Sequence, residues 1–100
     1  MIDYKQLIRD SRIKLFMKGD KFFPKCGFSK SAVEMLNEID AEYTTFDILE
    51  DQEVRQGLKE YSDWPTYPQL YIDGELIGGC DIMQEMHESG ELAQLIDGGN

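Results

Sequence analysis

The feature that most constrains this chain is a hairpin signal in its last third, where two short apolar segments flank an Asp-Gly pair. Asp73-Gly74 separates segments 69–72 and 75–78, and a two-residue turn of this kind joins antiparallel strands. Earlier in the chain, two further short segments, 13–17 and 43–47, are separated by a helical pattern. A strand, helix and strand in that order pair in parallel through a right-handed crossover. The two halves together predict a mixed sheet of four strands.

Helices are expected between and around these strands. Apolar residues recur at helical spacing in five segments, which are 4–12, 29–39, 50–61, 81–87 and 92–96. Ser29 and Asp81 are expected to cap two of them, and the apolar stripe of the third includes Tyr61, with Gly57 weakening that helix slightly. The predicted order is α-β-α-β-α-β-β-α-α. The fold class is therefore α/β, a four-stranded mixed sheet flanked by helices on both faces.

Length and charge exclude several classes of protein. A chain of 100 residues has room for one domain, and with 41% hydrophobic residues it can bury one modest core. No apolar run approaches the ~20 residues that a membrane span needs, and no signal peptide is visible. A formal net charge of −10 repels phosphate backbones and anionic lipid. We therefore expect no nucleic-acid or membrane partner.

The two cysteines indicate thiol chemistry. Cys26 and Cys80 are too few for a disulfide scaffold, and with His87 as the single histidine they cannot complete a four-ligand zinc site. Cys26 lies where a loop meets the start of a helix, and the N–H groups there stabilise a thiolate. Lys18 and Lys25 add positive charge in an acidic chain. A reactive, exposed Cys26 is therefore favoured over a buried structural cysteine.

The spacing Cys26-Gly27-Phe28-Ser29 is a C-x-x-C pattern with a hydroxyl in place of the second sulfur. A C-x-x-C pair closes its own disulfide and expels a mixed-disulfide partner. Ser29 cannot do this, so a mixed disulfide on Cys26 waits for an external thiol or for Cys80.

Two further segments suggest a binding cleft. In Trp64-Pro65-Thr66-Tyr67-Pro68, a cis Tyr67–Pro68 bond would leave the backbone of Tyr67 free to pair with an extended peptide, and a plain turn is the alternative. In Gly78-Gly79-Cys80-Asp81, backbone N–H groups and the carboxylate of Asp81 suit an α-amino acid head group, and an ordinary turn with a cap is the alternative. Arg55 either reaches a ligand carboxylate or pairs along a solvated helix. His87 is expected on a helix surface.

These motifs together resemble the monothiol (CGFS-type) glutaredoxins. The resemblance rests on Lys18, the CGFS segment, the WPTYP segment and the GGCD segment, and it runs from about Ile13 to about Ile96. Residues 46–59 also look like the glutaredoxin modules of multidomain thioredoxin–glutaredoxin (PICOT-type) proteins. The resemblance implies a thioredoxin fold, one glutaredoxin domain over residues 1–100 with its core at about 13–96, and a glutathione site.

The resemblance also implies a role for individual residues. Cys26 would be the active thiol, Lys18 and Arg55 would hold the glycine carboxylate of glutathione, and Tyr67 would pair with its cysteinyl backbone. Cys80 and Asp81 would take the γ-glutamyl end. Two features stay open: an internal Cys26–Cys80 disulfide, and the loop 20–25 with its unassigned Phe22-Phe23 pair.

Members of this family resemble one another in binding a [2Fe–2S] cluster, which needs four thiolates. Two chains would supply one Cys26 each and two glutathiones the rest, so the chain is expected to be a monomer without the cluster and a homodimer with it. The implied function is cluster transfer and iron and redox homeostasis, in the cytoplasm and nucleus, with iron–sulfur acceptors or BolA-like proteins as partners. The alternatives are a glutathione-dependent thiol–disulfide oxidoreductase, which removes glutathione from proteins, and an interaction module with an idle site.

Overall fold

The computed structural model describes residues 1–98. The helices and strands in chain order are α1 (Tyr4–Arg9), β1 (Ile13–Met17), α2 (Gly27–Glu38), β2 (Thr44–Asp47), the 3-10 turn η1 (Ile48–Glu50), α3 (Gln52–Ser62), β3 (Gln69–Ile72), β4 (Glu75–Gly78), α4 (Cys80–Ser89) and α5 (Glu91–Asp97). This order confirms the predicted alternation, and among the described residues none of the helices is long and apolar enough to cross a membrane.

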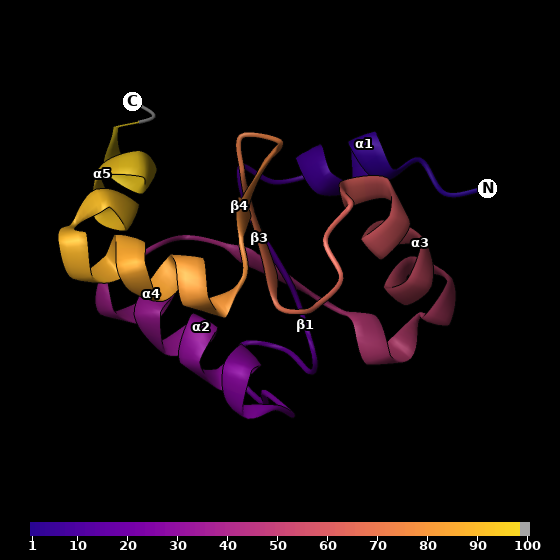
Figure 1. The fold of residues 1–100 in the computed structure, drawn as a ribbon, viewed down its shortest axis with the longest axis horizontal. Helices are drawn as coiled ribbons and strands as arrows, with labels where there is room; N and C mark the ends of the chain where they lie inside the picture. The colour runs from indigo at the N-terminus through magenta and orange to yellow at the C-terminus, as the bar shows by residue number, and fades with distance from the viewer. Residues whose placement is uncertain (99–100) are drawn as a thin grey trace.

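The strands form one mixed sheet in the order β2-β1-β3-β4 (Figure 1). The pair β1–β2 is parallel, while β1–β3 and β3–β4 are antiparallel. Asp73 and Gly74 both have positive φ, 52° and 81°, as the tight turn of a two-residue hairpin requires. The predicted sheet is therefore confirmed, with its central strand β1 between two partners of opposite direction.

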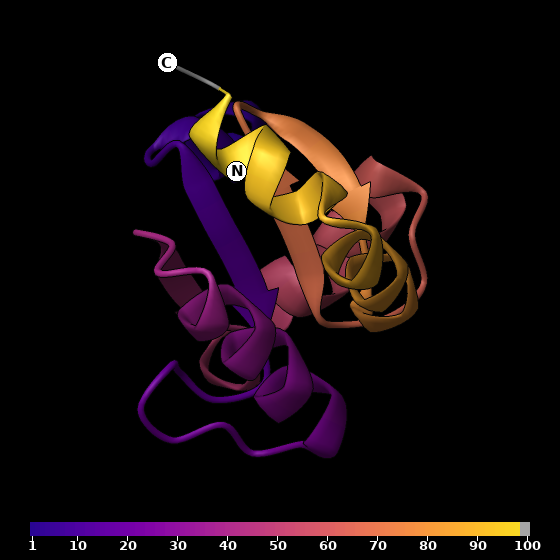
Figure 2. The same cartoon turned by 90° about the vertical axis from the view of Figure 1, so that its left-hand side faces the viewer.

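Helices cover both faces of the sheet, each over its own cluster of buried side chains. Figures 1 and 2 show α2, α4 and α5 on one face, with α3 on the other beside α1. The first face is centred on Leu15, Met17 and Leu36, and the second on Phe16 and Leu58. Alternate residues of β1 point to opposite faces, so burial of this whole strand follows from helices on both sides.

A buried lysine ties α1 to the central strand. The Nζ atom of Lys14 donates to both carboxylate oxygens of Asp10 at 2.7 Å and to the carbonyl of Leu7 at 2.8 Å. Lys14 is buried, and a buried charge needs such partners. The pairing with Asp10 allows this charged residue to be buried within an otherwise apolar strand.

Two predicted helix caps are wrong. Helix α2 begins at Gly27 with Cys26 as its N-cap, and α4 begins at Cys80 with Gly79 as its N-cap. Ser29 therefore lies within the first turn of its helix, where its hydroxyl has a tertiary partner instead of a capping role. Asp81 likewise lies in the first turn, because the chain leaves β4 at Gly78 and turns into the helix at Gly79.

Other local expectations need correction. Helix α1 ends at Arg9, and β2 starts at residue 44, one residue later than predicted. Tyr61 is 55% exposed and stacks on Tyr4 at 5.4 Å between ring centroids instead of joining the core. Gly57 has a packing role, since a Cβ there would lie within 2.8 Å of the Tyr4 ring. The tyrosine of α1 thus occupies the space over α3 that a side chain at position 57 would need.

Candidate functional site

A cleft of about 620 Å³ lies where the end of β1, the starts of α2 and α4, the helix α3 and the loop before β3 meet. It is lined by every residue that the sequence singled out for the site, which are Lys18, Cys26, Arg55, Tyr67, Cys80 and Asp81. These residues span 64 positions of the chain, and the sheet brings them to one edge. The cleft is therefore the candidate functional site.

Cys26 stands at the start of α2 with its thiol partly exposed. The backbone N–H of Ser29 lowers the pKa of Cys26, the largest favourable effect, against an opposing effect of burial. The backbone N–H of Phe28, the charge of Lys18 and the hydroxyl of Ser29 lower it further. N–H groups at a helix start favour an anion. Cys26 is thus the more readily ionised of the two thiols.

Cys80 differs from Cys26 although both line the cleft. Burial raises the pKa of Cys80, and the negative charges of Asp81 and of the Cys26 thiolate raise it further. Both cysteines are free thiols in the structure. Because the thiolate is the reactive form, Cys80 is the less reactive neighbour of Cys26.

Lys18 is fixed through its backbone on both sides. Its N–H donates to the hydroxyl of Ser29 at 3.1 Å, and its carbonyl accepts from the N–H of Lys25 at 2.9 Å. Both bonds join the end of β1 to the segment that carries Cys26. They hold the base of the Lys18 side chain beside the thiol.

The peptide bond between Tyr67 and Pro68 is cis, which is one of the two alternatives that the sequence left open. Within residues 1–98 the backbone N–H and C=O of Tyr67 form no hydrogen bond, so they are available to a ligand at the wall of the cleft. The Tyr67 hydroxyl donates to the carbonyl of Arg55 at 2.9 Å, and burial raises the pKa of Tyr67. This bond fixes α3 against the loop before β3 and so positions Arg55.

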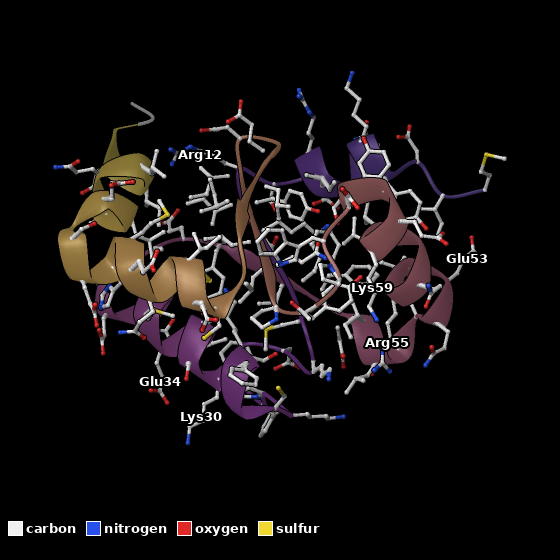
Figure 3. The ribbon with its side chains drawn as sticks, viewed as in Figure 1. Arg12, Lys30, Glu34, Glu53, Arg55 and Lys59 are labelled. Carbon is white, nitrogen blue, oxygen red and sulfur yellow. The ribbon has the colours of Figure 1, made fainter. Side chains whose placement is uncertain are left out.

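Lys59 and Trp64 also line the cleft, and sequence reasoning did not assign them. Lys59 follows Arg55 by one helical turn on α3, so the i,i+4 spacing was the available signal; Figure 3 shows both leaving this helix. Trp64 Nε1 is buried and has no hydrogen-bond partner among the described residues. A Cβ on Gly79 would lie 3.3 Å from that nitrogen, so the glycine keeps the cleft wall open beside the indole.

The positive charges of the cleft are unpaired. Among residues 1–98 the ion pairs are Arg12–Asp73, Lys14–Asp10 and His87–Glu38. Lys18, Arg55 and Lys59 therefore face the cleft without a carboxylate partner, which suits a ligand with carboxylates. His87 lies outside the cleft, as expected, and binds Glu38 of α2 at 2.6 Å.

Fold and site together define the class: a thioredoxin-fold protein with one activated thiol at a helix start and a cis-proline loop lining the same cleft. The model of the glutaredoxin family matches residues 13–77. With this match, and with monothiol glutaredoxins as its relatives, the chain belongs to the glutaredoxin family and to its monothiol members.

Three relatives show the extent of the similarity. Glutaredoxin-3 of Homo sapiens is 59% identical over 96% of this chain and 29% of its own length. A ycf64-like monothiol glutaredoxin of Synechocystis is 48% identical over 92% of this chain and 86% of its own length. The solution structure of reduced poplar apo GrxS14 superposes with a TM-score of 0.82 at 49% identity, covering 95% of this chain and 87% of that one. The chain thus spans about three tenths of the human relative.

Proposed function

We propose that the cleft binds glutathione and that Cys26, together with the thiol of that glutathione, carries a [2Fe–2S] cluster shared with a second chain. The observation that carries the proposal is the activated Cys26 thiol, which shares one cleft with three unpaired cations and the free backbone of Tyr67. Membership of the monothiol glutaredoxin family supports it.

The chemistry of glutathione fits the cleft at each end. Lys18 and Arg55 would bind the glycine carboxylate, with Lys59 as a third cation on the same wall. The backbone N–H and C=O of Tyr67 would pair with the cysteinyl residue as an added strand does. The first-turn N–H groups of α4 and the Asp81 carboxylate would take the γ-glutamyl carboxylate and amine. This arrangement sets the glutathione sulfur beside Cys26.

The donor set of one chain fits half of a shared cluster site. Among the described residues there is no group of three or more metal-binding side chains, and burial raises the pKa of Cys80. Cys26 is then the one readily ionised thiol of the protein. A [2Fe–2S] cluster has four thiolate ligands, so it would require two chains and two glutathiones. When bound, the cluster supplies a one-electron redox centre and a cargo for transfer. Iron–sulfur acceptors or BolA-like proteins in the cytoplasm and nucleus are the proposed partners.

Anaerobic reconstitution with iron, sulfide and glutathione tests the carrier function. We expect visible absorption and a doubling of mass, both lost in Cys26→Ser and retained in the matched control Cys80→Ser. A colourless monomer would refute cluster binding. If glutathione titration also left the amide resonances near Cys26 and Asp81 unchanged, an interaction module with an idle site would be the better description.

A second candidate is a monothiol oxidoreductase, which the lowered pKa of Cys26 favours. The Cys26 thiolate would attack the glutathione sulfur of a glutathionylated protein and release the protein thiolate. A second glutathione thiolate would then attack the glutathione sulfur on Cys26, giving glutathione disulfide and regenerating the Cys26 thiolate. Rapid turnover of a glutathione mixed disulfide would support this activity, and turnover no faster than with free glutathione would reject it.

A further inference from the structure

Three phenylalanines near the thiol expose most of their side chains. Phe22 is 79% exposed, Phe23 74% and Phe28 63%. Phe28 lines the cleft, whereas Phe22 and Phe23 do not line it and have no role in the function proposed above. Exposed large apolar side chains that gather on one segment mark interaction sites more often than scattered ones do.

The loop that carries Phe22 and Phe23 is held in place at several points. Asp20 Oδ1 accepts the N–H groups of Phe22 and Phe23 at 2.8 and 2.9 Å. Gly19 pairs with Pro24 across the base of the loop, and the N–H of Gly19 donates to Asp47 Oδ1 at 2.9 Å. These bonds set the backbone of the two phenylalanines before any partner arrives, so less ordering entropy is lost on binding.

Lys21 fixes the outer part of the same loop. Its Nζ atom donates to the carbonyl of Tyr43 and lies 4.2 Å from the centroid of the Tyr43 ring. The lysine side chain is therefore committed to the body of the protein. The phenylalanines that follow it are left on the outside.

The charge of this segment is opposite to that of the chain. Residues 18–30 hold four lysines and one aspartate, a formal charge of +3, in a chain of formal charge −10. The one acidic side chain, Asp20, is occupied by backbone N–H groups. Lys25 and Lys30 make no ion pair with the described residues, and Figure 3 shows Lys30 pointing outward from α2. Since Lys18 faces the cleft, Lys25 and Lys30 are the cations left for another partner.

We infer that Phe22, Phe23, Lys25 and Lys30 form a docking surface for an acidic protein segment that presents an aliphatic or aromatic side chain. The phenylalanines would bury the apolar side chain, and the two lysines would pair with flanking carboxylates. A short acidic segment can contact residues 18–30 alone, which carry a formal charge of +3. An extended anionic lipid surface or a nucleic acid would also contact the acidic remainder of the chain and be repelled by it. A second copy of this chain would bring two +3 segments together. The inference goes beyond the proposed function and does not require glutathione to bind.

Peptide titration of the reduced full chain, without glutathione or iron, tests this surface. The probe is a synthetic peptide with paired leucines among glutamates. Two matched peptides replace the glutamates by glutamines or the leucines by serines. We expect amide shifts at residues 20–30 with the first peptide, and at least about tenfold weaker binding of each matched peptide.

Matched variants locate the surface. Binding of the acidic peptide should weaken about tenfold in the double variant Phe22→Ser/Phe23→Ser and likewise in Lys25→Glu. Leu95→Ser, at a side chain 41% exposed on α5, and Lys5→Glu, on α1, should leave it unchanged. Glutathione affinity of Phe22→Ser/Phe23→Ser, measured by calorimetry, should equal that of the unaltered chain, which separates this surface from the cleft.

Several results would overturn the inference. Equal binding of the three peptides would show that neither charge nor apolar contact is recognised. Binding to phosphatidylserine vesicles that is lost in Phe22→Ser/Phe23→Ser would assign the surface to a membrane. A concentration-dependent doubling of mass that the same double variant abolishes would assign it to a second copy of the chain.

Discussion

The hydroxyl oxygen of Ser29 accepts a hydrogen bond from the backbone N–H of Lys18 at 3.1 Å, across eleven positions of the chain. Ser29 is fully buried, and its backbone N–H also lowers the pKa of Cys26. The position that holds the second sulfur in a C-x-x-C pair thus holds a structural hydroxyl here. It joins the helix that carries the thiol to the strand end that carries a cleft cation.

Replacing this hydroxyl should destabilise the fold. Ser29→Ala leaves the Lys18 N–H without its acceptor, and an unsatisfied buried donor costs about 1–3 kcal/mol. The midpoint of urea unfolding should fall accordingly. Ser31→Ala is the matched control on the same helix, since Ser31 makes no side-chain hydrogen bond among the described residues, and it should be neutral or slightly stabilising. Equal midpoints for the two variants would contradict the structural role of Ser29.

Restoring a second sulfur should change the chemistry. Ser29→Cys should permit an intramolecular disulfide with Cys26, because a C-x-x-C pair closes readily. After incubation with glutathione disulfide, mass spectrometry of Ser29→Cys should show loss of two hydrogens and no glutathione adduct, whereas the unaltered chain should accumulate the Cys26–glutathione adduct. A persistent glutathione adduct in Ser29→Cys would show that the two positions cannot reach each other.

The two thiols should ionise in different pH ranges, because their pKa values shift in opposite directions. In Cys80→Ser, the rate of alkylation of Cys26 by iodoacetamide should rise with pH and level off below the ordinary cysteine range, because the Ser29 N–H and Lys18 lower the pKa of Cys26. In Cys26→Ser, alkylation of Cys80 should rise only at higher pH, because burial and Asp81 raise the pKa of Cys80. Because folding lowers the pKa of Cys26, ionisation of this thiol stabilises the folded state. This contribution is complete above the pKa of the unfolded chain and is lost as the pH falls through the pKa of the folded chain. Coincident titration curves would contradict this assignment.

The cations of the cleft should control glutathione affinity. Arg55→Gln and Lys59→Gln should each raise the Kd for glutathione roughly three- to tenfold, as expected for a partly exposed charge-assisted contact. Added salt should weaken binding by the unaltered chain more than by either variant. Arg9→Gln, on α1 and away from the cleft, is the control for net charge. Calorimetry in which Arg9→Gln weakens binding as much as Arg55→Gln would contradict a local carboxylate site.

A methyl group on Gly79 should narrow the cleft. Its Cβ would lie 3.2 Å from the carbonyl oxygen of Pro68 and 3.3 Å from Trp64 Nε1, so the cleft wall must shift. We expect Gly79→Ala to weaken glutathione binding by about tenfold with a smaller loss of thermal stability. Gly27→Ala, where a Cβ meets nothing within 4 Å, should bind as the unaltered chain does. Unchanged affinity in Gly79→Ala would show that this wall does not contact the ligand.

Some elements were predictable because their signals are local. The Asp73-Gly74 turn fixes its hairpin through backbone conformations that these two residue types adopt easily. The apolar run of β1 predicts a buried strand, and Lys14 does not disturb it because Asp10, four residues earlier, pairs with the lysine. The cysteine motif likewise marks a helix start from its own residue types.

Other features depended on partners distant in sequence. Gly57 looked like a weak point in a helix, yet Tyr4 of α1 requires the space. Ser29 looked like a cap, yet Lys18 gives its hydroxyl a different bond. Tyr61 fitted the apolar stripe of α3, yet it stacks on Tyr4 near the surface. In each case a contact between separate elements overrode a local preference.

The sequence alone determined the order of the strands and helices and the mixed sheet, because turn chemistry and hydrophobic spacing act over a few neighbouring positions. Its motif residues also predict Cys26 as the reactive thiol. Only the tertiary structure decided that Lys59 and Trp64 join the cleft, that the pKa values of Cys26 and Cys80 shift in opposite directions, and that Phe22 and Phe23 remain outside. Burial and electrostatic environment depend on which distant segments pack together, and that packing is set by the whole fold.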